Sequence, residues 1–421
     1  MHPTPHTTDP GMVPGGPVGP APPPGRPTRR IGLALGVVGV GLLVVVLILA
    51  NIPLKEYGLS PGSALVVDGP AGAITVKQAH PGGGRLFFTT VLLQNRVTVW
   101  DRVTSFLHPD TQYVPKADVT GGVSDRTFQQ QNAQEMTDSQ LAAKVAALRR
   151  LGYAVPEHGD GALIVDVAQG TPADGPLHPG DVIFSVNGHP VAIESDVTAA
   201  VRADKVGDSV SLTVHRPAPA GAAPPGGTPG TAAAPSTSTP AGPAGSAPTA
   251  PARPPGTTVA LSLRLVACGS RCPGDPARPL IGISLQTDNQ SFELPQEVGL
   301  SIAANGVGGP SAGLAFTLGA IDALTSHNLT GGHKVAVTGT IDPDGTVGDV
   351  GGVAQKTVAV EREHAEYFLV PTSELATARA KARGHHLTIV PVATLDDALR
   401  FLQSIHGDLS GVPAAPAGSS G

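Results

Sequence analysis

Two residues in the last third of the chain, Ser311 and Lys356, have the types and spacing of a nucleophile and its base. Ser311 stands in the string GPSAG, which follows a glycine-rich stretch and opens an apolar helical pattern. At a helix N-terminus, unpaired N–H groups and the positive end of the helix dipole can stabilise an oxyanion. A serine there can also be a simple N-cap, so the string alone leaves both interpretations open.

Lys356 lies in the string VGGVAQK, where a glycine pair leads into a helical pattern. An unperturbed lysine has a pKa near 10.4, so a lysine that acts as a base near neutrality needs its pKa lowered by roughly 2 to 3 units. Burial among apolar neighbours lowers it in this way. Val353, Val358 and Val360 flank Lys356, and no acidic residue occurs between Val350 and Val360. Standing alone, Lys356 would be an ordinary solubility residue.

The serine string also fits G-x-S-x-G, the nucleophile elbow of α/β-hydrolases. That fold requires an acid and then a histidine downstream, within a larger sheet than the residues after Ser311 can form. The late histidines, His385 and His386, lie in a polar turn. The run Asp342-Pro343-Asp344-Gly345 has turn chemistry and is only distantly similar to a metal loop. We therefore expect neither a hydrolase elbow nor a metal or cofactor.

Three ordered motifs in this part of the chain resemble the proteolytic domain of the Lon family. They are GPSAG at 309–313, TGTIDPDGTV at 338–347 and VGGVAQK at 350–356. The resemblance implies a Ser/Lys dyad in which Ser311 attacks a peptide carbonyl and Lys356 accepts its proton and later donates it to the leaving amine. It implies that Thr338 supports the lysine. Thr340 stands where the longer Lon enzymes carry a glutamate, which weakens the detailed analogy.

Residues 161–216 contain short β runs, a PGDVIFSVNG turn and a helical pattern, in that order. They resemble a bacterial PDZ domain. The resemblance implies capture of a peptide by strand addition, beside a loop whose backbone N–H groups receive a C-terminal carboxylate. The sequence predicts this loop at Gly161, Ala162, Leu163 and Ile164, although no GLGF string is present. The alternative is a packing module that only spaces the catalytic domain from the membrane.

A run of apolar residues without a charge extends from Ile31 to Ile52, about the 20 residues that a helix needs to cross a bilayer. Arg26, Arg29 and Arg30 precede the run, so the positive-inside rule places the N-terminus in the cytoplasm and the rest of the chain outside. We expect a single-pass anchor in the cell membrane. A cleaved signal peptide is the alternative.

The sequence predicts an α+β protein of several parts. These are a disordered cytoplasmic tail (1–30), a transmembrane helix (31–52), a mixed α/β region (55–155), a PDZ-like β-rich domain (156–275) with a low-complexity insert (217–256), a Lon-type α/β proteolytic domain (280–407) and a flexible tail (408–421). Strand-like runs border the insert on both sides. We therefore expect it to be an overgrown hairpin loop, which is tolerable because loop-closure entropy grows slowly with length.

Composition narrows the possible partners. Among 421 residues, 14% are charged and the net charge is −6, so the chain lacks the basic patch of a nucleic-acid binder. The two cysteines, Cys268 and Cys272, form a C-x-x-x-C pair that outside the membrane favours a disulfide over two free thiols. A zinc site is disfavoured because no second pair with ligand spacing accompanies them.

Taken together, these features predict an ATP-independent serine endopeptidase, because no G-x-x-x-x-G-K-[ST] phosphate loop occurs. Residues 31–405 resemble the single-pass, PDZ-containing Lon-like proteases of Gram-positive bacteria. The resemblance implies protein or peptide substrates, extracytoplasmic or membrane-tethered, and a homo-hexameric ring. An inactive PDZ scaffold at the membrane and a peptidase that cleaves only itself are the alternatives.

Overall fold

The computed structural model describes residues 28–67, 73–75, 85–218, 256–272, 275–304, 306–325, 328–382 and 386–414. Most of the expected tails and of the insert, at 1–27, 219–255 and 415–421, lies outside these residues. The fold mixes α and β elements and divides into two compact units. One unit comprises Met1–Ser60 and Leu92–Gly122, and the other comprises Pro61–Val91 and Val123–Gly421.

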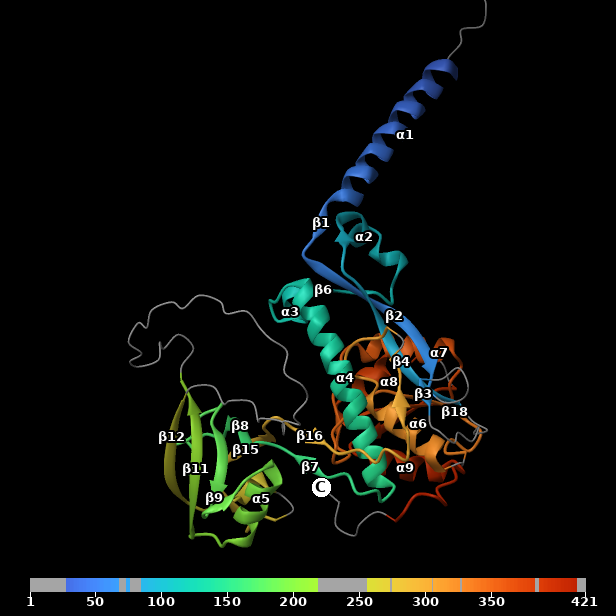
Figure 1. Ribbon diagram of the computed structural model, residues 1–421. Helices are drawn as coiled ribbons and strands as arrows, with labels where there is room; N and C mark the ends of the chain where they lie inside the picture. The colour runs from blue at the N-terminus through green and yellow to red at the C-terminus, as the bar shows by residue number, and fades with distance from the viewer. Residues whose placement is uncertain are drawn as a thin grey trace, which may run out of the picture. The chain divides into compact units, whose positions relative to one another are not determined.

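The first unit begins with helix α1 (Thr28–Asn51), whose side chains are described from Leu35 onward (Figure 1). Over the residues that the structure describes, no helix combines the length and the apolar character that crossing a membrane requires. The span that the sequence predicts at 31–52 is therefore not confirmed.

Short elements make up the rest of the first unit. They are β1 (Pro53–Leu54), β5 (Val97–Thr98), α2 (Val99–Val103), the 3-10 helix η1 (Ser105–Leu107), β6 (Gln112–Pro115) and α3 (Lys116–Thr120). A capping box starts α2, because Asp101 N–H donates to the Thr98 hydroxyl while the Asp101 carboxylate accepts from Thr98 N–H. β6 pairs antiparallel with Glu56–Leu59, the beginning of β2 (Glu56–Val66).

The second unit contains a sheet of order β22-β21-β18-β4-β2, and we call the elements around it the parallel-sheet domain. Its other strands are β4 (Arg85–Gln94), β18 (Lys334–Val337), β21 (Tyr367–Pro371) and β22 (Thr388–Val392), and these four run parallel to one another. Its helices are α4 (Asp125–Arg150), α6 (Gly313–Thr325), α7 (Val353–Arg362), η3 (Thr372–Glu374), α8 (Leu375–Lys381) and α9 (Leu395–Ser404). Two short pairs, β3 (Ile74–Thr75) with β17 (Ser301–Ile302) and β19 (Thr340–Ile341) with β20 (Val347–Gly348), complete it.

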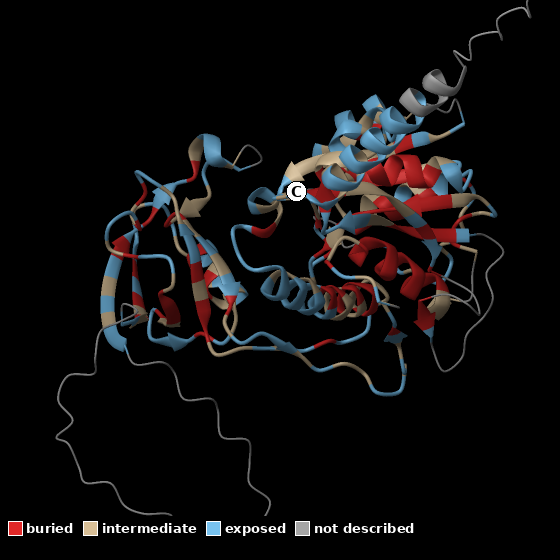
Figure 2. Ribbon diagram, turned by 90° about the horizontal axis from the view of Figure 1, so that it is seen from above, coloured by how far each residue is buried: buried red, intermediate tan, exposed pale blue. Residues whose placement is uncertain are grey.

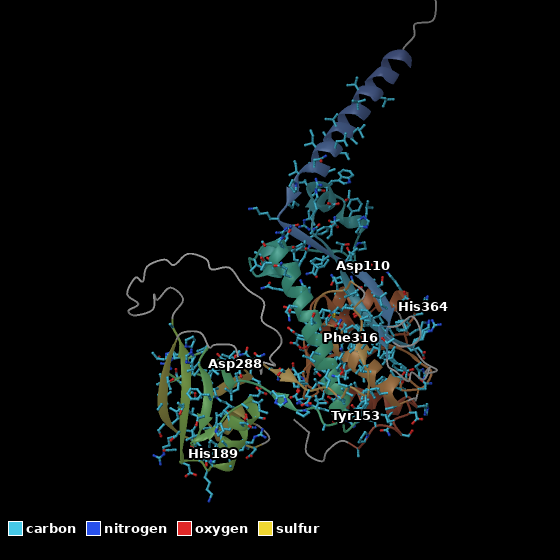
Figure 3. All side chains as sticks on the ribbon, viewed as in Figure 1. Asp110, Tyr153, His189, Asp288, Phe316 and His364 are labelled. Atoms are coloured by element: carbon cyan, nitrogen blue, oxygen red, sulfur yellow. A yellow bond between two sulfur atoms is a disulfide. The ribbon has the colours of Figure 1, made fainter. Side chains whose placement is uncertain are left out.

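Helices cover both faces of this sheet, and the alternation of its strands shows which residues face which helices. Phe88 and Val337 belong to a core with α6 and α9, and Phe88 packs on Phe316, with ring centroids 5.4 Å apart. Phe316 is labelled in Figure 3. Phe87 and Ala336 belong to a separate core with α7 and α8. Figure 2 shows these strands and helices as buried segments. The side chains of neighbouring residues in one strand therefore point to opposite faces of the sheet.

The structure corrects the predicted extent of this domain, which the sequence placed at 280–407. β2 and β4, from the region expected at 55–155, supply strands of the sheet, and α4 packs along α6. The parallel pair of β4 with β18 joins segments that are far apart in the sequence. Local patterns indicated strands and a helix here but carried no information on their partners.

The smaller body of the second unit, which we call the small β-domain, has the strand order β12-β11-β9-β8-β15. Its elements are β8 (Ala162–Val167), β9 (Val182–Val186), β10 (His189–Pro190), α5 (Glu194–Ala203), β11 (Ser209–Pro217), β12 (Gly256–Arg264) and β15 (Ile283–Thr287). β11 pairs with β12 along its whole length, so the insert lies between two paired strands, as in the expected hairpin. β15, which the sequence assigned to the next domain, belongs to this sheet.

Two short strand pairs and a 3-10 helix accompany the strands of the small β-domain. They are β7 (Glu157–His158), which pairs with β16 (Ser291–Phe292), and β13 (Val266–Ala267), which pairs with β14 (Pro279–Leu280). Between β13 and β14 lies the 3-10 helix η2 (Gly269–Arg271).

Candidate functional site

Ser311 lies in the turn that leads into α6, and α4 holds this turn in place. The Gly309 N–H donates to the Asn132 carbonyl at 2.9 Å, and the Ser139 hydroxyl donates to the Pro310 carbonyl at 3.0 Å. Gly309 has φ +84°, a conformation that favours glycine. These two bonds with α4 involve the two residues directly before the serine and fix the direction from which the chain enters the helix.

The backbone around Ser311 offers hydrogen-bond donors. In the part of the chain that the structure describes, nothing accepts from the N–H groups of Ser311 or Ala312, whereas the next N–H, of Gly313, donates to the Pro310 carbonyl at 3.1 Å. These donors lie at the N-terminal end of α6, where the helix dipole is positive. They are the kind of group that stabilises the oxyanion of a tetrahedral intermediate.

Thr338 follows β18 and lies directly against the serine turn. Its hydroxyl donates to the Ser311 carbonyl at 3.2 Å, and the N–H of Gly339 donates to the same carbonyl at 3.1 Å. The N–H of Leu314 returns a bond to the Gly339 carbonyl at 3.1 Å. The turn is therefore fixed to the carboxyl end of a central parallel strand, the edge at which α/β sheets bind their ligands.

Lys356 reaches the same place from α7. Only 2% of this residue is exposed, and its Nζ donates to the Thr338 Oγ1 at 3.0 Å. Burial lowers the pKa of Lys356 from 10.5 to about 7, because the ammonium loses its hydration, and Glu374 opposes this change only in part. A lysine with this pKa is partly neutral near pH 7 and can accept a proton.

The structure thus brings together the three residues that the sequence predicted for the reaction. Thr338 joins them, because it accepts from Lys356 and donates to Ser311. Asp342 and Asp344 form a turn, in which Gly345 N–H donates to the Asp342 carbonyl at 2.9 Å. Among the described residues no group of His, Cys, Asp and Glu side chains is arranged to hold a metal ion.

The predicted peptide-binding residues, Gly161 to Ile164, are not at a free edge, and this prediction needs correction. β8 pairs with β15 on one side and with β9 on the other. Ala162 and Ile164 are 0% and 1% exposed. A strand with two partners cannot take a third, so β8 offers no free edge for strand addition.

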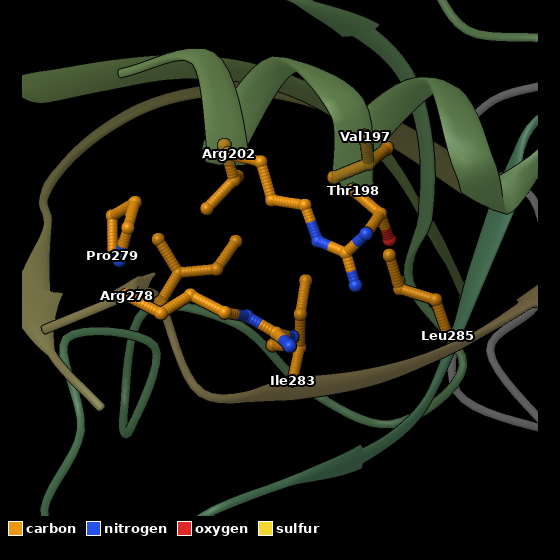
Figure 4. A pocket seen from close by; sticks show the side chains of 9 residues that line it. Val197, Thr198, Arg202, Arg278, Pro279, Ile283 and Leu285 are labelled. Atoms are coloured by element: carbon orange, nitrogen blue, oxygen red, sulfur yellow. The ribbon is translucent and has the colours of Figure 1, made fainter. Parts of the chain in front are cut away.

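Strand addition requires a free strand edge, which β8 does not have. A groove between α5 and β15 lies beside such an edge. Among the residues that the structure describes, β15 is the edge strand of its sheet, and one side of its backbone has no strand partner there. Apolar and polar side chains line the groove (Figure 4); they are Val197, Thr198, Val201 and Arg202 of α5, with Arg278, Pro279, Ile281, Ile283 and Leu285. An extended peptide could pair with β15 and place apolar side chains against α5.

Two arginines line this groove, and a disulfide lies nearby in the sequence. Arg202 and Arg278 extend toward the same space (Figure 4), and no described residue forms an ion pair or hydrogen bond with either guanidinium. The structure joins Cys268 to Cys272 in a disulfide, and Cys268 N–H donates to the Arg278 carbonyl at 2.8 Å. The disulfide therefore anchors the segment that carries one of the arginines.

A local signal for this groove was present in the sequence. The string LIGIS at 280–284 places a glycine between apolar residues directly before a strand. Gly282 has φ +88°, and a Cβ there would lie 2.2 Å from Thr171 Oγ1. A short apolar run with one glycine is common, so the string alone does not identify a peptide-binding loop.

Two family models match parts of this chain. Residues 149–222 match the PDZ domain, and residues 292–403 match the Lon protease (S16) C-terminal proteolytic domain, which includes Ser311, Thr338 and Lys356. The chain is 33% identical over 98 residues to the Lon protease of Chloroflexus aggregans, a match that covers 23% of this chain and 12% of that protein. It therefore spans only a small part of its curated relative.

Solved structures similar to this chain include two PDZ domains of SdrC-like proteins. The domain from Listeria monocytogenes is 18% identical, with coverage of 30% of this chain and 87% of that one and a TM-score of 0.19. The domain from Listeria innocua is 20% identical, with coverage of 30% and 93% and a TM-score of 0.18.

Proposed function

We propose that this chain, which carries a PDZ domain and the C-terminal serine-peptidase domain of the Lon proteases, is an ATP-independent endopeptidase with a Ser311/Lys356 dyad. The observation that carries the proposal is the buried Lys356, whose Nζ lies 3.0 Å from Thr338 Oγ1 while the Thr338 hydroxyl bonds to the Ser311 carbonyl. A buried lysine that forms no ion pair with a described carboxylate is costly to retain unless its neutral form has a use.

The proposed reaction has three steps. Neutral Lys356 accepts the proton of the Ser311 hydroxyl as the serine oxygen attacks the peptide carbonyl. The N–H groups of Ser311 and Ala312 stabilise the resulting oxyanion. The Lys356 ammonium then donates its proton to the leaving amine, and a water molecule, activated by the neutral lysine, releases the acyl group from Ser311.

We also propose that the groove of the small β-domain binds the substrate. An extended segment of a substrate would add to β15, with apolar side chains against Val197 and Val201 of α5. Arg202 and Arg278 would attract a carboxylate at one end. This recruitment would raise the effective concentration of locally unfolded substrates for the dyad on the same chain without the use of ATP.

We further propose that the chain is anchored in the cell membrane by residues 31–52, with the catalytic domain outside. The support is the charge-free apolar run and the three arginines that precede it. Substrates would then be extracytoplasmic or membrane-tethered proteins. A homo-hexameric ring is the assembly that the Lon resemblance favours.

Cleavage of casein by the full chain, without ATP, tests the peptidase. The wild type is compared with Ser311→Ala and Lys356→Ala, and with the surface controls Ser404→Ala and Lys205→Ala. We expect either dyad substitution to abolish cleavage and neither control to change it. Loss of activity in all variants and in the wild type, with retained peptide binding, would instead support a peptide-binding scaffold. Because casein is an added substrate, its cleavage also excludes a protein that cleaves only itself.

A further inference from the structure

One buried hydroxyl of β4 has no hydrogen-bond partner among the described residues. Thr89 of β4 is 2% exposed, and its Oγ1 forms no hydrogen bond with any described residue. A buried hydroxyl without a partner costs free energy, and such groups are rare in folded proteins. Thr89 lies outside the segment that matches the Lon proteolytic domain, so no motif of that domain points to it.

The register of the sheet places Thr89 beside Thr338. β4 and β18 are parallel neighbours, with Phe87 opposite Ala336 and Phe88 opposite Val337. Continued by one residue, this register sets Thr89 opposite Thr338. The bond from Thr338 N–H to the Leu369 carbonyl, at 3.0 Å, shows that the strand direction continues to this residue.

Both threonines face α7. Phe87 and Ala336 pack in the core that includes α7, whereas Phe88 and Val337 pack in the opposite core, so the next residues, Thr89 and Thr338, return to the α7 face. The contact of Lys356 with Thr338 confirms this orientation for β18.

A second contact confirms the orientation for β4. A Cβ added to Gly352, the N-cap of α7, would lie 2.7 Å from the Val91 side chain, so Val91 lies against the start of that helix. Val91 and Thr89 are two residues apart on one strand and share a face. Lys356 is one helical turn beyond Gly352, since its N–H donates to the Gly352 carbonyl at 3.0 Å.

Among the described residues, Lys356 has more hydrogen-bond donors than partners, and Thr89 has an acceptor without a donor. A lysine ammonium has three N–H donors, and among the described residues Lys356 has one partner, Thr338. When Lys356 takes the proton of Ser311, one N–H points to Thr338, one returns the proton to the leaving amine, and one needs another acceptor. A hydroxyl on the neighbouring strand, facing the same helix, is suited to accept it.

We propose that Thr89 is a positioning residue of the dyad, whose hydroxyl accepts a hydrogen bond from the Lys356 ammonium formed during the reaction. Thr89 thereby shares with Thr338 the task of orienting the lysine. This inference rests on the peptidase function proposed above and extends the site to a strand that precedes the small β-domain in the sequence.

The test compares Thr89→Val with Thr89→Ser in the full chain, by casein cleavage without ATP from pH 5.5 to 9. Valine keeps the shape and removes the hydroxyl, so kcat should fall about tenfold with KM unchanged. Because an acceptor stabilises the charged lysine, its loss should shift the midpoint of the pH–kcat profile toward acid by about one unit. Serine should restore both the rate and the midpoint.

Controls separate positioning from folding. Thr325→Val removes a hydroxyl at the C-terminal end of α6, where it donates to the Ile321 carbonyl at 2.9 Å. This variant should leave the pH midpoint unchanged. Replacement of an unpartnered hydroxyl by a methyl group is neutral or stabilising, so Thr89→Val should keep the melting temperature. Thr89→Ala provides a second hydroxyl-free variant should the valine fail to fold.

Two results would overturn the inference. An unchanged rate and pH midpoint in Thr89→Val and Thr89→Ala, with Ser311→Ala and Lys356→Ala inactive, would refute the role of Thr89 and leave the peptidase intact. Cleavage that does not depend on Ser311 or Lys356 would remove both the dyad and its positioning residue.

Discussion

Lys356 Nζ and Thr338 Oγ1 are 3.0 Å apart, although they come from a helix and a strand that the sequence separates by a turn and a short β pair. Thr338 can accept from the lysine because its own proton is directed to the Ser311 carbonyl, 3.2 Å away. The hydroxyl therefore has one defined orientation in the resting site. This bond orients the lysine but does not neutralise it, so burial controls its charge.

The pH dependence of cleavage should report the charge of Lys356. The protonated lysine cannot accept the Ser311 proton, and burial lowers its pKa to about 7. We therefore expect kcat/KM for casein to rise with pH through about 7, and to be about tenfold lower at pH 6 than on its alkaline plateau. A rate that is constant from pH 5.5 to 9, or that falls through this range, would contradict a lysine base.

Lys356→Met should stabilise the fold while it abolishes activity. The lysine has a pKa of about 7 when folded and 10.5 as a free side chain, so the unfolded chain binds more protons between these values. Burial of the lysine therefore lowers the free energy of unfolding. This loss is fully present below pH 7, amounts to about 4 kcal/mol at pH 7 and disappears above pH 10.5. Calorimetry should show a higher Tm for Lys356→Met at pH 7 and a smaller difference at pH 10. If Lys356→Met had an equal or lower Tm than the wild type at pH 7, burial of the lysine would not cost free energy.

The sequence could indicate Ser311 and Lys356 as candidates for the proposed dyad because each lies in a local motif. GPSAG and VGGVAQK each combine a turn, a helix start and a chemical group within a few residues. Thr89 could not be found in this way. Its significance depends on the parallel pairing of β4 with β18, a long-range contact that no local periodicity encodes.

The peptide-binding loop was predicted wrongly for a related reason. The run at Gly161 to Ile164 has the pattern of a strand, and the pattern is correct, since β8 begins at Ala162. Whether a strand is central or at the edge depends on its neighbours. β15, after the insert and the disulfide, occupies the edge that β8 would have needed.

Arg202→Gln with Arg278→Gln should weaken peptide binding without changing the dyad. Each guanidinium lacks a partner among the described residues and extends into the groove, so a carboxylate on the ligand can pair with both. We expect the Kd of a fluorescent peptide with an apolar C-terminal residue to rise about tenfold, and the wild-type affinity to fall with salt. Arg264→Gln, on β12 of the same domain, is the control. The same peptide is also tested with a C-terminal amide. Equal affinities for the two peptides would show that the groove does not recognise the C-terminal carboxylate.

Gly282→Ala should damage the groove through a steric clash. Gly282 has φ +88°, and its new Cβ would lie 2.2 Å from Thr171 Oγ1, so the backbone before β15 must move away from the segment that follows β8. Positive φ alone strains an alanine by about 1 kcal/mol. Gly188→Ala separates the two effects, because its φ is +79° and nothing lies within 4 Å of the added atom. Peptide titrations of both variants should show a loss of binding for Gly282→Ala and near wild-type affinity for Gly188→Ala. Equal losses in the two variants would assign the effect to backbone strain and would remove the argument that the position of β15 forms the groove.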